Sequence, residues 1–342
     1  MSDQDELKVR ISNLYKVFGK NPQGVMDKVQ AGISKTDLLE QTGHVMGLND
    51  ISLDIPARRI QVIMGLSGSG KSTLIRHINR LIEPTAGEIW IDGENVLEMN
   101  PAQLRDLRRF KTSMVFQKFG LLPHRTVEQN VSYGLEIQGV DEDEAAKRSA
   151  HWIDRVGLSG FEKHYPGQLS GGMQQRVGLA RALATDAEIL LMDEAFSALD
   201  PLIRTDMQSI LLDLQEELHK TIIFITHDLD EALRLGENIA ILRDGAVIQT
   251  GTAQNIVMKP ADDYIRDFVA DINRGRVITM RSIMGPVSSN ITATIPASTP
   301  LEEALPLLNN IDGQSATVVD KTGTPIGAID LSTAIEAMRV AE

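Results

Sequence analysis

The stretch GLSGSGKS, Gly65 to Ser72, decides how this chain folds. It fits the pattern G-x-x-x-x-G-K-[S/T] and follows a short apolar run, Gln61 to Met64. The residues after it recur at helical spacing as Leu74, Ile75 and Ile78. Glycines in such a loop let backbone N–H groups wrap a phosphate, and the start of the helix adds positive potential. The sequence therefore predicts a phosphate-binding loop between a strand and a helix.

The side chains of this loop suit a nucleotide and a divalent cation. Lys71 can bridge phosphate oxygens with its ammonium group, and the hydroxyl of Ser72 can ligate Mg²⁺. A chance glycine-rich turn is the alternative, which the flanking strand and helix argue against. ATP and Mg²⁺ are the predicted ligands. We expect the nucleotide to be bound by Gly65, Ser67, Gly68, Ser69, Gly70, Lys71, Ser72 and Thr73.

Two carboxylates end a second apolar run. Asp193 and Glu194 directly follow Ile189 to Met192. A phosphate-binding loop works with an acidic residue at the end of a neighbouring strand, so Asp193 is expected to hold Mg²⁺ through water. Glu194 is expected to orient and polarise the attacking water. Adjacent carboxylates alone are often only a solvated loop start, and it is the loop at Gly65 that favours the catalytic interpretation.

Three more polar residues lie at the ends of predicted elements. Gln117 follows a strand at 113–116, His227 follows a strand at 222–225, and Asp200 precedes a proline. Alone, Asp200 is explained equally well as a helix N-cap, whereas a lone histidine after a strand, such as His227, is more often structural. Both gain a functional interpretation if they lie at strand ends on one side of a sheet, where ligands of open α/β sheets bind.

Strand-like and helix-like segments alternate along most of the chain. This alternation predicts an α/β fold with a parallel sheet covered by helices. The segment 20–47 has room for a short helix or two and shows no obvious core. Strands are expected at 61–64, 88–92, 113–116, 189–192 and 222–225.

The composition excludes several classes of protein. The 342 residues include no cysteine, which rules out disulfides and thiolate metal sites. Apolar runs are far shorter than the roughly 18 residues that cross a bilayer, and the N-terminal MSDQDELKVR is unlike a secretion signal. A soluble cytoplasmic protein is therefore expected. A net charge of −13 argues against nucleic acid as a partner.

Six motifs, taken in order, resemble those of the nucleotide-binding subunits of ABC transporters. They are GLSGSGKS, MVFQ, LSGGM, ILLMDE, SALD and ITHD, over roughly residues 9–271. The resemblance implies a P-loop ABC ATPase domain with a parallel-sheet core, a helical subdomain and an antiparallel β subdomain. It further implies that Gln117 contacts Mg²⁺ and water and faces the membrane subunit, and that His227 contacts the γ-phosphate. Phe18 resembles the aromatic residue that stacks on adenine, the alternative being a core phenylalanine.

The motif LSGGM, at 169–173, resembles the signature loop of this family. The resemblance implies that Ser170, Gly171 and Gly172 contact ATP held by the opposite subunit of a head-to-tail homodimer. Asp200 would reach across the same interface. A loop that acts on the other subunit's ATP needs no lysine of its own. The family usually has Gln where this chain has Met173, so no contact is carried over to that side chain.

Longer stretches resemble one branch of the family, the ATPase subunits of glycine betaine/proline-type importers. They are IMGLSGSGKST, NRLIEPTAGEI, LMDEAFSALDPLIR and THDLDEALRLG, together with the insertion at 20–47. The resemblance implies uptake of a quaternary amine or related osmolyte, such as glycine betaine, proline betaine, choline or trimethylamine N-oxide. It implies integral membrane permease subunits, an indirectly acting extracytoplasmic solute-binding protein, and a peripheral location on the cytoplasmic face of the inner membrane. An amino acid such as histidine or proline is the alternative solute, and a soluble ABC ATPase outside transport is the alternative function.

Two domains are expected, an ABC ATPase domain at 1–274 and a small α+β module at 275–342. The helical subdomain of the first is placed at about 118–180. STPLEEALPLL and ATVVDKTGTPIGAI in the second resemble a cystathionine-β-synthase-type (CBS) motif. Relatives often carry two such motifs that pair, and there is room here for one, which is expected to pair with its copy or to serve in dimerisation. A sensor and a docking element both stay open. Asp330 and Thr333 depart from the nucleotide-binding pattern of such motifs, so no adenosine ligand is expected.

Overall fold

The chain is described by a computed structural model over residues 6–117, 120–197, 199–270, 272–287 and 293–339. It divides into two units between Ile248 and Gln249. The domain boundary predicted after residue 274 lies inside the second unit, and the assignment of functional domains stays a prediction. In the described ranges, no helix has the length and apolar character needed to span a membrane.

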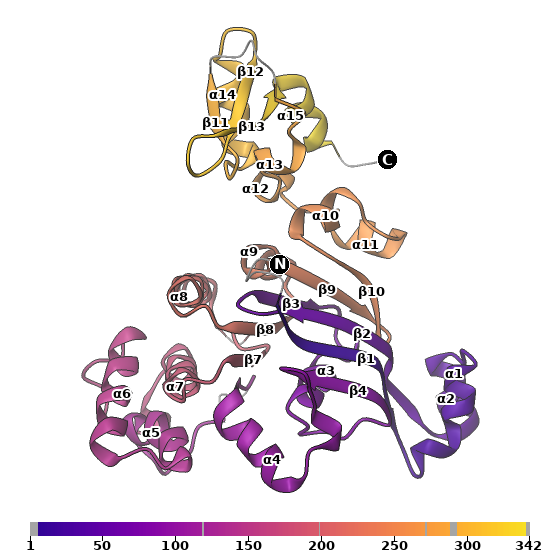
Figure 1. Ribbon diagram of the computed structural model, residues 1–342, viewed down its shortest axis with the longest axis vertical. Helices are drawn as coiled ribbons and strands as arrows, with labels where there is room; N and C mark the ends of the chain where they lie inside the picture. Colours follow the sequence, from indigo (N-terminus) through magenta and orange to yellow (C-terminus); the bar gives the residue numbers. More distant parts are fainter. Residues whose placement is uncertain (1–5, 118–119, 198, 271, 288–292, 340–342) are drawn as a thin grey trace. The chain divides into compact units, whose positions relative to one another are not determined.

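The first unit is built on a six-stranded sheet in the order β10-β9-β3-β8-β7-β6 (Figure 1). β3 pairs in parallel with β8 and β9, and β7 with β8 and β6. Parallel sheets are covered on both faces, which is why β3, β7 and β8 are buried at every residue. The predicted α/β fold with a parallel sheet is confirmed. The strands are β3 (Ile60–Met64), β6 (Thr112–Val115), β7 (Ile189–Asp193), β8 (Thr221–Thr226), β9 (Asn238–Arg243) and β10 (Ala246–Gly251).

A second sheet is antiparallel, in the order β2-β1-β4-β5. The strand expected at 88–92 belongs here, as β4, and not to the parallel sheet. Alternation of strands and helices predicts that strands exist but does not say which sheet each one joins. The strands are β1 (Leu7–Phe18), β2 (Val45–Pro56), β4 (Ala86–Ile91) and β5 (Glu94–Asn95).

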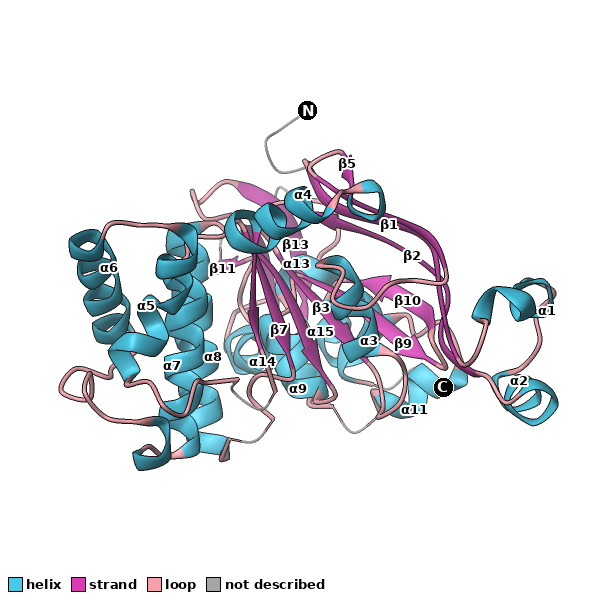
Figure 2. Ribbon diagram, turned by 90° about the horizontal axis from the view of Figure 1, so that it is seen from below, coloured by secondary structure: helices cyan, strands magenta, loops and turns pink. Residues whose placement is uncertain are grey.

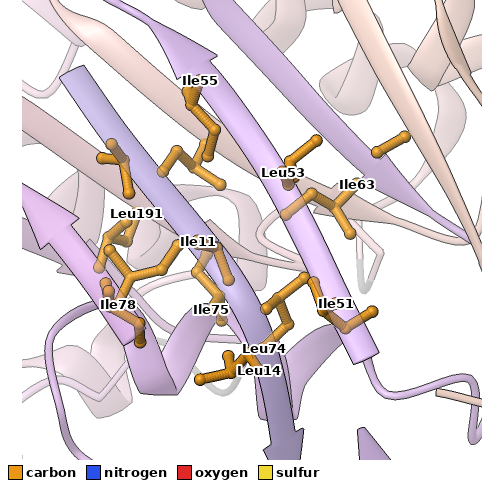
Figure 3. Close-up of a cluster of buried hydrophobic side chains, with 14 of the residues drawn as sticks. Ile11, Leu14, Ile51, Leu53, Ile55, Ile63, Leu74, Ile75, Ile78 and Leu191 are labelled. Carbon is orange, nitrogen blue, oxygen red and sulfur yellow. The ribbon is translucent and has the colours of Figure 1, made fainter. Parts of the chain in front are cut away.

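The main hydrophobic core lies between these two sheets and helix α3 (Lys71–Ile78). Figure 3 shows Ile11 and Leu14 of β1 beside Leu74 and Ile75 of α3, all of them almost completely buried. Because the phosphate-binding loop joins β3 to α3, this core fixes both ends of the loop.

Outside the insertion at 20–47, the remaining helices of the first unit cover the parallel sheet or extend beyond its β6 edge. α5, α6 and α7 pack against one another there (Figure 2). α5 begins at a capping box between Thr126 and Gln129, ends at Gln138 and is capped by Gly139, which has a positive φ. The helices are α4 (Pro101–Asp106), α5 (Val127–Gln138), α6 (Glu142–Arg155), α7 (Gly171–Ala184), α8 (Pro201–Leu218) and α9 (Leu229–Leu235).

The insertion at 20–47 has a core of its own, contrary to expectation. It contains α1 (Met26–Gln30) and α2 (Lys35–Thr42). Their apolar residues gather around Val17 of β1, which lies outside the insertion, and Met46 of β2, which lies at its end. The buried cluster comprises Val17, Val25, Met26, Val29, Leu38 and Met46.

The second unit carries the small module predicted near the C-terminus. β11 pairs in parallel with β12, which pairs antiparallel with β13. The elements are α10 (Ala253–Met258), α11 (Asp263–Phe268), α12 (Arg274–Val277), α13 (Met280–Ile283), β11 (Thr294–Pro296), α14 (Leu301–Asn309), β12 (Ser315–Val319), β13 (Pro325–Asp330) and α15 (Leu331–Met338).

Candidate active site

The loop GLSGSGKS connects β3 to α3 as predicted, and two of its glycines are sterically required. Gly65 has φ +151°, and a Cβ there would lie 2.2 Å from the carbonyl oxygen of Leu242. Gly70 has φ +103°, and a Cβ there would lie 2.7 Å from the carbonyl oxygen of Gly47. These neighbours are backbone atoms that cannot move aside cheaply, so the loop can follow this path only with glycine at both positions.

Lys71 lies almost completely buried beneath this loop. Its Nζ donates to the carbonyl oxygens of Gly65 at 2.8 Å and Leu66 at 3.1 Å, and lies 3.6 Å from Oε1 of Glu194. Burial lowers the pKa of Lys71, and the carboxylates of Glu194 and Asp193 offset part of that effect. The ammonium group is thus held at the loop by backbone oxygens.

Asp193 ends β7 and is completely buried. One carboxylate oxygen accepts from Oγ of Ser72 at 2.7 Å, and the other accepts from the guanidinium of Arg76 at 2.9 Å. The structure therefore brings together two of the three residues predicted to contact Mg²⁺, Ser72 and Asp193. Arg76 was not predicted, although its position four residues after Ser72 on α3 places both side chains on one face of the helix.

Glu194 is the meeting point of the predicted catalytic residues. Its Oε2 accepts from Nε2 of Gln117 at 2.9 Å and lies 3.5 Å from Nδ1 of His227. The backbone of Glu194 has φ +47°, an uncommon conformation for a non-glycine residue, and its N–H donates to the carbonyl oxygen of Ile225. Gln117, Glu194 and His227 thus lie at the ends of the adjacent strands β6, β7 and β8.

Phe18 lies at the rim of a cleft of about 460 Å³ that the phosphate-binding loop also lines. Its side chain is 40% exposed, and Nζ of Lys16 lies 5.0 Å from the ring centroid. An exposed ring at a cleft does not fit the alternative of a core phenylalanine. Ser67, Gly68, Gly70, Lys71, Ser72, Thr73, Gln117 and Glu194 also line the cleft.

The residues predicted to act on the opposite subunit do not line this cleft. Ser170 caps α7 by accepting from the backbone N–H of Met173, and Asp200 caps α8 by accepting from that of Ile203. A Cβ on Gly172 would lie 2.8 Å from the side chain of Ile203, so a glycine there allows α7 and α8 to meet closely. Within one subunit Asp200 acts as a helix N-cap, as the alternative interpretation expected. Its contact with the other subunit stays a prediction.

Arg204 is a further residue that was not predicted. Its guanidinium donates to Oδ2 of Asp228 at 3.0 Å and to the carbonyl oxygen of Leu199 at 3.2 Å. Asp228 caps α9 and directly follows His227, while Leu199 directly precedes Asp200. One side chain thus connects the segment that enters α8 with the segment that carries His227.

The parallel sheet, the loop at Gly65 and the carboxylates at the end of β7 together define the chain as a P-loop nucleoside triphosphatase. Residues 48–197 match the family model described as ABC transporter. Among solved structures, the ATP-binding cassette MJ0796 in its dimeric post-hydrolysis state, bound to ADP and Pi, matches with a TM-score of 0.62. The two sequences are 33% identical, and the match covers 71% of this chain and 98% of the cassette.

Curated relatives match over most of the sequence. The glycine betaine/carnitine transport ATP-binding protein GbuA of Listeria monocytogenes is 55% identical, over 81% of this chain and 70% of its own. The glycine betaine transport ATP-binding protein OpuAA of Bacillus subtilis is 49% identical, over 98% of this chain and 79% of its own length. The trimethylamine N-oxide transport system ATP-binding protein TmoW of Ruegeria pomeroyi is 45% identical, over 95% of each. This chain belongs to the ABC transporter family as an ATP-binding subunit, an ATPase that couples hydrolysis to transport.

Proposed function

We propose that this chain energises the uptake of a quaternary amine or related osmolyte. The observation that carries the proposal is the 49% identity to a glycine betaine transport protein over 98% of this chain, which takes in the insertion and the second unit as well as the ATPase motifs. Other relatives are named for carnitine and trimethylamine N-oxide, so the class of solute is better supported than any single member.

The test is uptake by a reconstituted complex. The chain would be co-expressed with permease and solute-binding subunits of the same organism, and the complex would be placed in ATP-loaded proteoliposomes. Labelled glycine betaine, carnitine, choline, trimethylamine N-oxide, histidine and proline would be offered in turn. ATP-dependent uptake of a quaternary amine or of the N-oxide is expected, and a Lys71→Ala complex serves as the inactive control. Uptake of histidine or proline alone would contradict the proposal.

The proposed nucleotide contacts follow from the loop and cleft. Backbone N–H groups of residues 65–70 surround the phosphates, Lys71 neutralises their charge, and Phe18 packs on the adenine ring at the rim. The geometry that supports this is the pair of glycines that admit no side chain and the buried ammonium group held at the loop.

The donors beside the loop also fit Mg²⁺. The hydroxyl of Ser72 is a hard oxygen ligand, the carboxylate of Asp193 lies 2.7 Å from it and would hold the ion through water, and Gln117 lines the same cleft. Mg²⁺ prefers few protein ligands together with phosphate oxygens and water, which agrees with one hydroxyl, one carboxylate and one amide. When bound there, Mg²⁺ would neutralise charge that develops on the phosphates.

Glu194 is proposed as the general base. Its carboxylate would accept a hydrogen bond from the attacking water and take its proton as the water attacks the γ-phosphorus. Gln117 and His227 hold the same carboxylate oxygen from two sides and so fix its direction. His227 is about half exposed, and its ring is therefore also accessible to a phosphate oxygen.

A homodimer completes the proposed site. Ser170, Gly171, Gly172 and Asp200 would contact ATP bound to the other subunit, with the N–H groups at the start of α7 facing its γ-phosphate. The dimeric state of the matched ATP-binding cassette supports this arrangement. The dimer would act on two permease subunits at the cytoplasmic face of the membrane, with an extracytoplasmic binding protein delivering the solute.

Residues 275–342, within the second unit, are proposed to form a CBS-like module that associates with its copy in the dimer. Its order β11-α14-β12-β13-α15, with one parallel and one antiparallel pairing, supports the proposal. Leu307 of α14 and Ile335 of α15 are about half exposed although apolar, and a second copy would cover such residues. Light scattering of the full chain without nucleotide tests this: Leu307→Asp with Ile335→Asp should weaken dimerisation, and an unchanged dimer would contradict it.

A further inference from the structure

The insertion at 20–47 contributes a wall of the nucleotide cleft. Lys35 of α2, together with Val45 and Met46 at the start of β2, lines the same cleft as the phosphate-binding loop. The insertion therefore lies beside the nucleotide cleft and forms part of its lining. One of its residues, Lys35, carries a charge that suits the expected ligand.

Packing fixes the position of α2 beside the loop. Leu38 is completely buried among the apolar residues of the insertion, and it lies three residues after Lys35 on the helix. At the base of the insertion, Nε2 of His44 lies 2.9 Å from the carbonyl oxygen of Lys20. A Cβ on Gly19 would lie 2.4 Å from the His44 ring, so the two ends of the insertion are held closely together.

Lys35 extends from this helix to the phosphate-binding loop. Its Nζ donates to the carbonyl oxygen of Gly68 at 3.2 Å. Lys71 contacts the same loop at Gly65 and Leu66, so two ammonium groups reach the loop at different residues. A lysine ammonium has three donors, and in the described part of the chain one of those of Lys35 has an acceptor.

The place of Lys35 in its helix also needs an explanation. It is the first residue of α2, after the N-cap Ser34, whose hydroxyl accepts from the backbone N–H of Asp37. A positive charge at a helix N-terminus is opposed by the helix dipole, and acidic residues are favoured there. The charge therefore weakens α2 slightly, and an anion in the cleft would offset that cost.

We propose that Lys35 binds the phosphate chain of the nucleotide, which makes the insertion part of the nucleotide site. The ammonium group would exchange the neutral carbonyl of Gly68 for a charged phosphate oxygen, a stronger partner. The inference rests on the proposed binding of nucleotide at the loop. It gives the insertion the role of holding a second phosphate-binding cation over the cleft.

Isothermal titration of ADP into the full-length chain tests the inference. Lys35→Gln should raise the Kd about three- to tenfold, because one charge-assisted hydrogen bond at a partly exposed site is lost. Lys35→Ala, which favours the helix, should do the same, whereas Lys35→Arg should stay within about twofold of the original chain. Lys28→Gln removes an exposed charge from α1 of the same insertion and serves as the matched control.

Different results would contradict the role of Lys35 and the nucleotide site itself. The effect of Lys35→Gln should shrink as KCl is raised, because salt screens an exposed charge. An unchanged Kd in both Lys35→Gln and Lys35→Ala, or an equal rise in Lys28→Gln, would overturn the role of Lys35 alone. Failure of the unaltered chain to bind ADP would instead overturn the nucleotide site. Melting curves without nucleotide check that each variant is folded.

Discussion

Nε2 of Gln117 donates a 2.9 Å hydrogen bond to Oε2 of Glu194, the oxygen that also lies 3.5 Å from Nδ1 of His227. The three side chains come from the ends of three neighbouring strands, so the spacing of the sheet sets their separation. Lys71 lies near the other oxygen of the same carboxylate, at 3.6 Å from Oε1. Both carboxylate oxygens of Glu194 thus have polar neighbours, and these neighbours help to fix the orientation of the carboxylate.

Replacing Glu194 by glutamine should lower ATP hydrolysis by about 10²–10⁴-fold, the usual share of a positioned general base. ATP binding should persist, because the loop and Lys71 are untouched. Phosphate release measures the first effect and equilibrium titration the second. Glu188→Gln, at the opposite end of β7, where Glu188 pairs with Lys8 and Lys111, is the matched control. Normal turnover in the Glu194 variant would remove that residue from its assigned role.

Replacing Ser170 by arginine should block ATP-driven dimerisation and leave ATP binding by the monomer nearly unchanged. Ser170 lies at the exposed start of α7 and does not line the chain's own cleft. A bulky cation there would obstruct the start of α7, where the other subunit's γ-phosphate is expected. Light scattering with and without ATP follows the association in a Glu194→Gln background that also carries Leu307→Asp and Ile335→Asp, which weaken the proposed nucleotide-free dimer. Ser159→Arg, an exposed change in the loop between α6 and α7, should dimerise normally, and dimerisation of both variants would contradict the signature assignment.

The elements around the nucleotide could be predicted because their signals are local. The pattern of Gly65 to Ser72 requires a strand before it and a helix after it, and the acidic pair after Met192 requires only that β7 lie beside β3 or β8. The roles proposed for Asp193 and Glu194 follow from the residues themselves, whereas those proposed for Gln117 and His227 rest on the resemblance to a family.

The parts that escaped prediction depend on contacts between distant segments. In the sequence, Arg204 looks like any other charged residue of an amphipathic helix, and only the fold brings Asp228 to it. Lys35 likewise stands out only because α2 packs beside the loop. The core of the insertion could not be seen for the same reason, because Val17 of β1 completes it from outside and Met46 joins it only once β2 has formed. No periodicity within 20–47 records such pairings.

Replacing Arg204 by methionine should lower the turnover number on the order of tenfold with little change in KM for ATP. Methionine keeps much of the packing but cannot hold Asp228 and Leu199 together, so the His227 segment loses its link to the segment entering α8. Steady-state ATPase kinetics separate the two parameters. Arg155→Met breaks an exposed ion pair with Glu217 near the end of α8 and should leave both parameters unchanged. A pure rise in KM would show that Arg204 acts on binding instead.

Glu231 provides a prediction of pH dependence. This carboxyl is buried in α9, where Oε1 accepts from Nε2 of Gln208 at 3.0 Å, and Arg234 fixes that amide by donating to its oxygen. Burial raises the pKa of Glu231. The folded state thus binds this proton more tightly than the unfolded state does. Its contribution to stability is present below the unfolded pKa of about 4.3 and is lost as pH rises through the folded pKa.

Glu231→Gln should therefore become more stable relative to the unaltered chain as pH increases from about 4.5 to 8. Glutamine does not titrate, and its amide oxygen can still accept from Gln208, so the variant avoids burying a charge in this region. Thermal melting of both proteins at several pH values gives the difference directly. Glu216→Gln, an exposed change on α8, should show no such trend. If the difference for Glu231→Gln is flat across this range, or falls with rising pH, then Glu231 does not titrate in the folded protein as its burial implies.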